Sequence, residues 1–249
     1  ADDSKRQQLA QRAYRIMSAQ RQDQLLSALL GLAPETPVME ATSMTMTLPT
    51  RINLGSGKSY APQCLNIDIN PYWQPDIVAD LSQPGALDQR FDAGRFGRTP
   101  LARGYFQRID AVDVLEHVPT LTTLMTHCLE LLAVGGEFHI KVPYELSYGA
   151  WQDPTHVRAF NERSWLYYTD WFWYLGWREA RFDLITNALD LSPLGVQLKE
   201  QGQTLQQILL QPRAVDAMNV VLRKRLLTAA EQKQVEEYLR RPERTQAQG

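Results

Sequence analysis

The stretch Thr50-Arg51-Ile52-Asn53-Leu54-Gly55-Ser56-Gly57-Lys58 decides the fold of this 249-residue chain. Its first half is a short apolar strand that runs straight into a glycine turn. Glycine lets the backbone turn tightly and approach a ligand closely, because a side chain there would fill the ligand's space or forbid the needed φ angle. Gly-x-Gly turns also occur in loops that bind nothing, so this stretch alone leaves ligand binding open.

Further elements follow along the chain. Strands are predicted at 64–68, 77–80, 109–115, 137–142, 178–185 and 218–224, and helices at 120–132, near 199–211 and at 228–239. Residues 84–108 are expected to be irregular surface with a short helix, and Gly135-Gly136 is expected to end the helix before it. Strands that alternate with helices favour right-handed crossovers and a mainly parallel sheet.

The composition fits one soluble α/β domain. Lys and Arg number 26 and Asp and Glu number 28, so the basic excess typical of a nucleic-acid binder is missing. The two cysteines, Cys64 and Cys128, indicate neither a disulfide framework nor a cysteine-rich zinc site. No apolar run reaches about 18 residues, and the first residues differ from a secretion signal. We therefore expect a cytoplasmic protein without a membrane span.

Ligands of an open parallel sheet bind outside the carboxyl ends of its strands. Asp68 ends the second predicted strand, thirteen positions after Gly55, where a carboxylate can accept hydrogen bonds from both hydroxyls of a ribose. Asp80 follows the third strand, where it could meet an adenine. The alternative for both acids is that they cap turns.

The sequence lacks glycines that two nucleotide-binding motifs require, and this restricts the class of cofactor. A dinucleotide fingerprint needs a third glycine where this chain has Tyr60, and a phosphate-binding loop needs a leading glycine where it has Ile52 or Asn53. A nucleoside cofactor without phosphate therefore fits the pattern better.

Five ordered motifs carry a family resemblance. They are Asn53-Leu54-Gly55-Ser56-Gly57-Lys58, Leu65-Asn66-Ile67-Asp68-Ile69-Asn70-Pro71, Asp80-Leu81, Asp113-Val114-Leu115-Glu116-His117-Val118 and Leu132-Ala133-Val134-Gly135-Gly136-Glu137. The chain resembles class I S-adenosylmethionine-dependent methyltransferases over residues 50–143, and 153–160 resembles a branch of small bacterial members whose substrates are mostly uncharacterised.

The resemblance implies a Rossmann-like fold with a mainly parallel seven-stranded sheet, an antiparallel last strand and helical extensions at both ends. The expected divisions are an N-terminal helical extension at 1–48, the methyltransferase domain at 49–225, and a C-terminal helix and tail at 226–249. The extension at 1–48 has two interpretations, a substrate lid or dimer arm, and a structural appendage.

S-adenosylmethionine is the implied cofactor. The implied binding residues are Asn53, Gly55, Gly57, Asp68, Ile69, Asp80, Leu81, Asp113, Leu115 and Glu116. The two glycines would pass the methionine part, Asp68 would hold the ribose, and Asp80 with Leu81 would meet the adenine. The family usually has an acid where this chain has Asn53, which affects how the amino-acid end of the cofactor is held.

Methyl transfer to a hydroxyl needs a base. Of the four histidines, His156 beside Asp153 is the leading candidate, and His117 is the second, with loop shaping as its alternative. His127 and His139 are expected to be structural. A metal centre from Asp153, His156, Glu116 and His117 matches no ligand spacing, so no metal is expected.

These residues predict methyl transfer to an oxygen or nitrogen of a small molecule or glycan. One alternative is a nucleic-acid or protein methyltransferase that uses Arg90, Arg95, Arg98, Arg103 and Arg108 on phosphates. Another is a cofactor-binding but inactive partner subunit. The aromatic segment at 165–177 has three interpretations: substrate contact, core packing, or a homo-oligomer interface. The terminal helices are the other candidate for such an interface.

Overall fold

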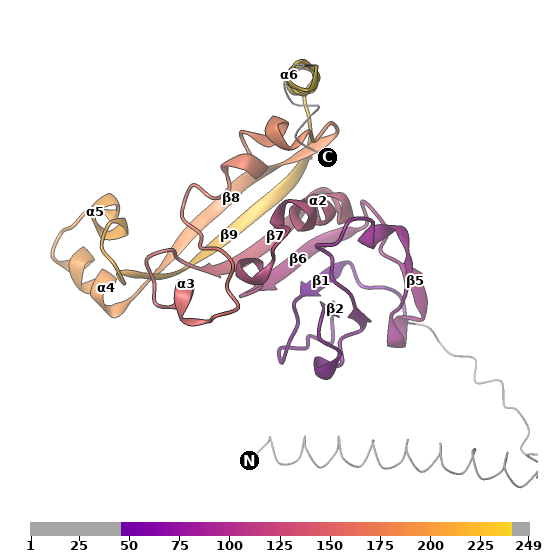
Figure 1. Ribbon diagram of the computed structural model, residues 1–249, viewed down its shortest axis with the longest axis horizontal. Coiled ribbons are helices and arrows are strands. Elements are labelled where there is room, and N and C mark those ends of the chain that lie inside the picture. Colours follow the sequence, from indigo (N-terminus) through magenta and orange to yellow (C-terminus); the bar gives the residue numbers. More distant parts are fainter. Residues whose placement is uncertain (1–45, 241–249) are drawn as a thin grey trace, which may run out of the picture. The chain divides into compact units, whose positions relative to one another are not determined.

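The computed structural model describes residues 46–240 of the chain. Seven strands of this part form one sheet in the order β3-β2-β1-β6-β7-β9-β8 (Figure 1). They are β1 (Arg51–Leu54), β2 (Leu65–Asp68), β3 (Ile77–Val78), β6 (Phe106–Val112), β7 (Leu132–Pro143), β8 (Ala180–Leu191) and β9 (Val215–Leu226). A separate pair joins β4 (Arg90–Asp92) to β5 (Arg98–Pro100).

Strand directions confirm the predicted sheet. β1 pairs in parallel with β2 and β6, and the parallel pairing continues to β3 on one side and β7 on the other. β9 is antiparallel to both β7 and β8, between which it lies. Because the chain turns first to one side of β1 and then to the other, the strand order reverses between β1 and β6, where ligands of such sheets bind.

Five helices and several short 3-10 turns complete the described part. The helices are α2 (Leu121–Leu131), α3 (Gly149–Gln152), α4 (Pro193–Glu200), α5 (Leu205–Leu209) and α6 (Ala229–Leu239). The turns are η1 (Pro71–Trp73), η2 (Ala86–Asp88), η3 (Gly94–Phe96), η4 (Leu115–His117), η5 (Leu166–Tyr168) and η6 (Phe172–Leu175). The predicted extension at 1–48 lies outside the described residues up to position 45.

Three local predictions were wrong. Residues 84–108 contain the β4–β5 hairpin, and the fourth predicted strand ends at Val112, not at 115. The strand β7 starts at Leu132, directly after α2, so Gly135-Gly136 does not end the helix. A Cβ on Gly136 would lie 2.9 Å from the carbonyl oxygens of Ala133 and Phe106, which is too close, so glycine is required where the β6–β7 register shifts.

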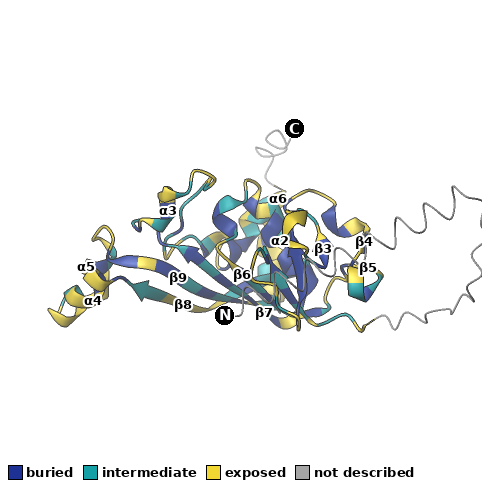
Figure 2. Ribbon diagram, turned by 90° about the horizontal axis from the view of Figure 1, so that it is seen from below, coloured by how far each residue is buried: buried dark blue, intermediate teal, exposed yellow. Residues whose placement is uncertain are grey.

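The core follows the centre of the sheet. Figure 2 shows buried residues along β6, β7 and β9, whereas α4 and α5 are largely exposed. The helix α2 buries Leu124, Met125 and Cys128. Both cysteines of the chain are buried and free, as the sequence predicts. Within 46–240, no helix is long and apolar enough to cross a membrane.

The aromatic segment at 165–177 packs in part in the core, while Tyr167, Trp171 and Tyr174 are exposed. Trp165, Tyr168, Phe172 and Trp177 are buried. Trp165 stacks on Phe160 with ring centroids 5.5 Å apart. These rings therefore support the core interpretation.

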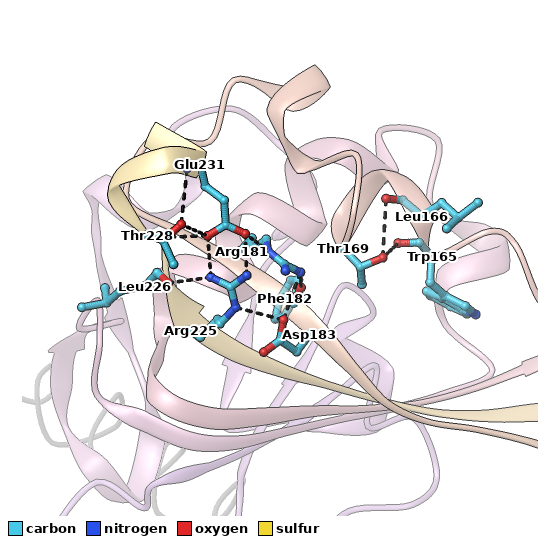
Figure 3. Close-up of polar contacts among 10 residues, drawn as sticks. All are labelled: Trp165, Leu166, Thr169, Arg181, Phe182, Asp183, Arg225, Leu226, Thr228 and Glu231. Atoms are coloured by element: carbon cyan, nitrogen blue, oxygen red, sulfur yellow. Dashed lines mark hydrogen bonds and ion pairs between the residues drawn. The ribbon is translucent and has the colours of Figure 1, made fainter. Parts of the chain in front are cut away.

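Charged side chains fasten the start of α6 to the β8–β9 pair (Figure 3). Glu231 accepts hydrogen bonds from Arg181 and Arg225, and Arg225 also donates to Asp183. Glu231 completes a capping box with Thr228 at the helix N-terminus. Hydrogen bonds from Arg225, the largest contribution, hold the pKa of Glu231 well below its usual range.

Candidate cofactor site

The glycine loop after β1 is held against β2. Gly55 and Ser56 both donate backbone hydrogen bonds to Ile67 O, at 2.8 and 3.2 Å. A Cβ on Gly55, whose φ is +62°, would overlap the side chain of Val114 beyond β6. A Cβ on Gly57 would have only Gly55 O near it, at 3.9 Å. Glycine is therefore needed at 55 for packing within the protein and is favoured at 57 by its φ of +44°, where a Cβ would still leave open space.

Asp68 ends β2 and ties the loop to the next turn. Its carboxylate accepts from Gly57 N at 2.7 Å and from Asn70 N at 2.8 Å, one bond to each oxygen. The turn-capping alternative is thus realised at Asn70. Each carboxylate oxygen keeps a further lone pair that could accept from a ribose hydroxyl. Ile69, next to it, is exposed.

Asp80, at the end of β3, also caps a turn. One oxygen accepts from Ser82 N and Ser82 Oγ, and the other accepts from Gln83 Nε2. Burial alone would raise the pKa of Asp80, but the hydrogen bonds from Ser82 and Gln83 outweigh it and lower the pKa. A cavity of about 410 Å³ is lined in part by Asp80 and Val78. Leu81 is buried in the core.

Asn53 faces a polar network and has a structural task there. Its side-chain amide donates to Ser59 O and to Asn66 Oδ1, both at 2.9 Å. The aspartate that the family usually has here could not donate either bond, because an ionised carboxylate only accepts. The departure from the family pattern thus belongs to the way this chain builds the loop from 55 to 64.

The same network centres on Asp76, a buried carboxylate with several donors. It accepts from Tyr60 OH, Asn66 N and Arg95 Nε, at 2.8, 2.8 and 2.9 Å. Arg95, from η3, also donates to the carbonyl oxygens of Pro62 and Cys64. Although burial opposes it, the hydrogen bonds, first that of Arg95, lower the pKa of Asp76.

The chain after β6 brings the remaining predicted residues together. Asp113 is exposed and has a φ of +54°, an uncommon conformation for a residue other than glycine. Leu115 and Glu116, in η4, are 0% and 1% exposed. Neither carboxylate oxygen of Glu116 has a hydrogen-bond partner. Burial, and secondarily the charge of Asp113, raises the pKa of Glu116 to about 7.

His117 and His156 lie against each other beside Glu116. Their ring centroids are 4.5 Å apart in an edge-to-face arrangement. Val157 N donates to Glu116 O at 2.8 Å, which fixes the loop of His156 on η4. The ligand atoms of Glu116, His117 and His156 all lie within 4.8 Å of one another.

The partners of the two rings differ from the expected pairing of His156 with Asp153. His156 Nδ1 contacts Ala150 O at 3.0 Å, while Asp153 accepts from the hydroxyl of Thr155 at 2.7 Å. Thr155 Oγ1 in turn contacts His117 Nδ1 at 2.9 Å. Sequence reasoning missed Thr155 and Ala150, although the Asp-Pro-Thr order signals a turn.

The other two histidines have structural contacts. His127 Nδ1 contacts Leu81 O at 2.8 Å inside the core, and His139 Nε2 contacts Glu137 at 2.8 Å. Both fit the structural interpretation made from the sequence.

Comparisons with known proteins find similarity only among solved structures. No family model and no curated protein matches the chain. A SAM-dependent methyltransferase from Archaeoglobus fulgidus matches at 13% identity and a TM-score of 0.45, over 72% of this chain and 87% of that one. An S-adenosylmethionine-dependent methyltransferase from Mesorhizobium loti matches at 14% identity and a TM-score of 0.44, over 79% and 95%.

The [4+2]-cyclase SpnF matches to a similar degree, at 12% identity and a TM-score of 0.45, over 76% of this chain and 78% of that one. Identities and TM-scores this low say nothing about activity. The strand order, with β9 inserted antiparallel between β7 and β8, decides the architecture. The chain has the class I methyltransferase fold.

Proposed function

We propose that the protein transfers a methyl group from S-adenosylmethionine to an oxygen or nitrogen of a small molecule or a glycan. One observation carries the proposal: the glycine loop, Asp68 and the turn with Glu116 and His117 follow the carboxyl ends of the central strands β1, β2 and β6, next to the strand-order reversal. His156, from the loop after β7 and α3, lies against His117 at the same place. In this arrangement Gly57 borders open space for the methionine part, and Asp68 holds the ribose.

Methyl transfer requires alignment of the two reactants and removal of one proton from the acceptor. The acceptor O–H or N–H loses its proton, the oxygen or nitrogen forms a bond to the methyl carbon, and the carbon–sulfur bond breaks to leave a neutral thioether. Alignment of the two reactants supplies most of the acceleration. His156 is the candidate base in a metal-free site, because its Nε2 carries the lone pair when Nδ1 donates to Ala150 O.

Three of the five arginines invoked for the nucleic-acid alternative already form ion pairs within the protein. Arg95 pairs with Asp76, Arg103 pairs with Asp88 and Glu130, and Arg108 pairs with Asp110. These side chains are already compensated by carboxylates within the protein. The inactive-subunit alternative drew on Asn53, whose bonds to Ser59 and Asn66 give it a structural reason.

Calorimetry with S-adenosylhomocysteine tests the proposal. The wild-type protein should bind, and Asp68→Ala should bind about 30-fold or more weakly, because two hydrogen bonds to a charged group are worth at least about 2 kcal/mol together. Glu237→Ala is the matched control, since the Glu237 side chain on α6 is 60% exposed and pairs with Lys233. Circular dichroism establishes that each variant is folded. Absence of wild-type binding, or unchanged binding by a folded Asp68→Ala, would overturn the proposal.

A further inference from the structure

We propose that Glu116, His117 and His156 bind one divalent transition-metal ion. The three side chains come from two segments 39 positions apart, η4 and the loop after α3, and their ligand atoms lie within 4.8 Å of one another. One carboxylate and two imidazoles are a common protein ligand set for zinc and iron, which leaves positions open for water or substrate. The sequence spacing gave no sign of this site.

Glu116 supplies the first independent observation. Glu116 is 1% exposed, and both of its carboxylate oxygens lack a hydrogen-bond partner. Buried carboxylates are normally paired, hydrogen-bonded or bound to metal, because an isolated buried charge is costly. Among the described residues, no ion pair includes Glu116, so a cation beside it would supply the missing partner.

The contacts of the two Nδ1 atoms decide which nitrogen of each imidazole carries the lone pair. A carbonyl oxygen only accepts, so the contact with Ala150 O places the proton of neutral His156 on Nδ1 and the lone pair on Nε2. The Thr155 hydroxyl donates to Asp153, so its oxygen accepts from His117 Nδ1. His117 therefore also has its lone pair on Nε2. Metal-ligating histidines usually donate their other ring N–H in this way.

Binding requires only small movements. Ligand atoms around one tetrahedral ion lie about 3.4 Å apart when the bonds are about 2.1 Å long. The three side chains would therefore close slightly around the ion. The contacts of Ala150 O and Thr155 Oγ1 with the two Nδ1 atoms hold the rings on the side away from Nε2.

The use of the ion in catalysis rests on the proposed function. Val114, the residue before η4, packs against Gly55, so the proposed metal site and the glycine loop belong to neighbouring segments. An acceptor hydroxyl bound at an open position would have its pKa lowered by the ion. With both Nε2 atoms bound to metal, neither histidine is free to act as the base, so the proton would leave to solvent from the metal-bound oxygen.

Cobalt titration of the full chain, after treatment with a chelator, tests the site. Co²⁺ should bind at one equivalent with visible absorption bands, and Zn²⁺ should displace it. Glu116→Gln, His117→Ala and His156→Ala should each weaken Co²⁺ binding about 100-fold or more. His139→Ala, which removes a histidine outside the cluster, should bind as the wild type does.

A second-sphere variant distinguishes a metal site from a merely structural cluster. Thr155→Val removes the acceptor of His117 Nδ1–H and should weaken Co²⁺ binding about 10- to 100-fold while all three ligands remain. If the histidine variants fail to fold, Glu116→Gln and Thr155→Val still decide the matter.

No saturable Co²⁺ binding by the wild type, or binding that these two folded variants leave unchanged, would overturn the metal site. Binding of S-adenosylhomocysteine is measured separately in each variant, so failure of the metal site and failure of the proposed function give different results.

Discussion

Asp76 and Glu116 are two buried carboxylates with opposite surroundings. Asp76 is 9% exposed and accepts hydrogen bonds from Tyr60, Asn66 and Arg95, which lower its pKa. Glu116 is 1% exposed and accepts none, and burial raises its pKa to about 7. The first is a completed structural unit. The second has no hydrogen-bond partner among the described residues, and this difference is the ground on which the metal site is proposed at Glu116 and not at Asp76.

The largest expected effect on stability is at Asp76. Asp76→Asn should lower the free energy of unfolding by about 2–4 kcal/mol, because Arg95 and Asn66 lose their acceptor. The value stays below that of a fully buried pair since the Arg95 side chain keeps 26% exposure. Urea unfolding measures it. Asp88→Asn, in an exposed pair with Arg103, should change stability by less than about 1 kcal/mol. Equal effects of the two variants would remove the distinction drawn for Asp76.

Lowering the pH should reduce the stability that Asp76 contributes, and this effect should be smaller than that of the Asp76→Asn substitution. The folded-state pKa of Asp76 is lowered, so its carboxyl binds fewer protons folded than unfolded. Its stabilisation is present above the unfolded pKa of about 3.9 and is lost as the pH falls through the folded value. Urea midpoints measured from pH 6 to pH 3 should fall less steeply in Asp76→Asn than in the wild type. Glu231, whose pKa is also lowered, keeps part of the slope in both proteins. Parallel curves would show that Asp76 does not titrate as its contacts require.

The smallest expected effect is a gain in stability, at Glu116. Glu116→Gln should raise the free energy of unfolding by about 1 kcal/mol in the presence of a chelator, because a neutral amide is less costly to bury than an unpaired carboxylate. The melting temperature should rise by about 2–4 °C. Added Zn²⁺ should stabilise the wild type and leave Glu116→Gln unchanged. A variant less stable than the wild type without metal would mean that Glu116 already has a partner.

The sequence predicts the strands of the sheet well because the signal for each strand lies in a few consecutive residues. Apolar stretches ending in Gly55, Asp68 and Asp80 identify β1, β2 and β3, and the fold of the family supplies the strand order. The boundaries fail where distant contacts decide them. Gly135-Gly136 resembles a helix end, but its environment is set by Phe106 of a neighbouring strand.

The sequence names candidate site residues but not the contacts that hold them. His117 and His156 were identified by their positions after strands, whereas their closeness depends on the bond from Val157 N to Glu116 O. Asn53 was taken as a cofactor residue on family grounds, yet it contacts Ser59 and Asn66. The bond from Val157 to Glu116 and the bond from Asn53 to Asn66 do not follow from spacing, because each joins segments that meet only after the sheet forms.

The connection from β1 to β2 spans residues 55–64 without a helix, although parallel strands are usually joined by a longer helical crossover. Arg95, which arrives about 30 positions later, donates to Pro62 and Cys64 and compensates Asp76. A nascent chain that has emerged only as far as residue 89 would hold Asp76 without its cation. The first three strands therefore depend on a later segment for their final arrangement, and the loop from 55 to 64 should become protected from hydrogen exchange only after the β4–β5 hairpin has folded.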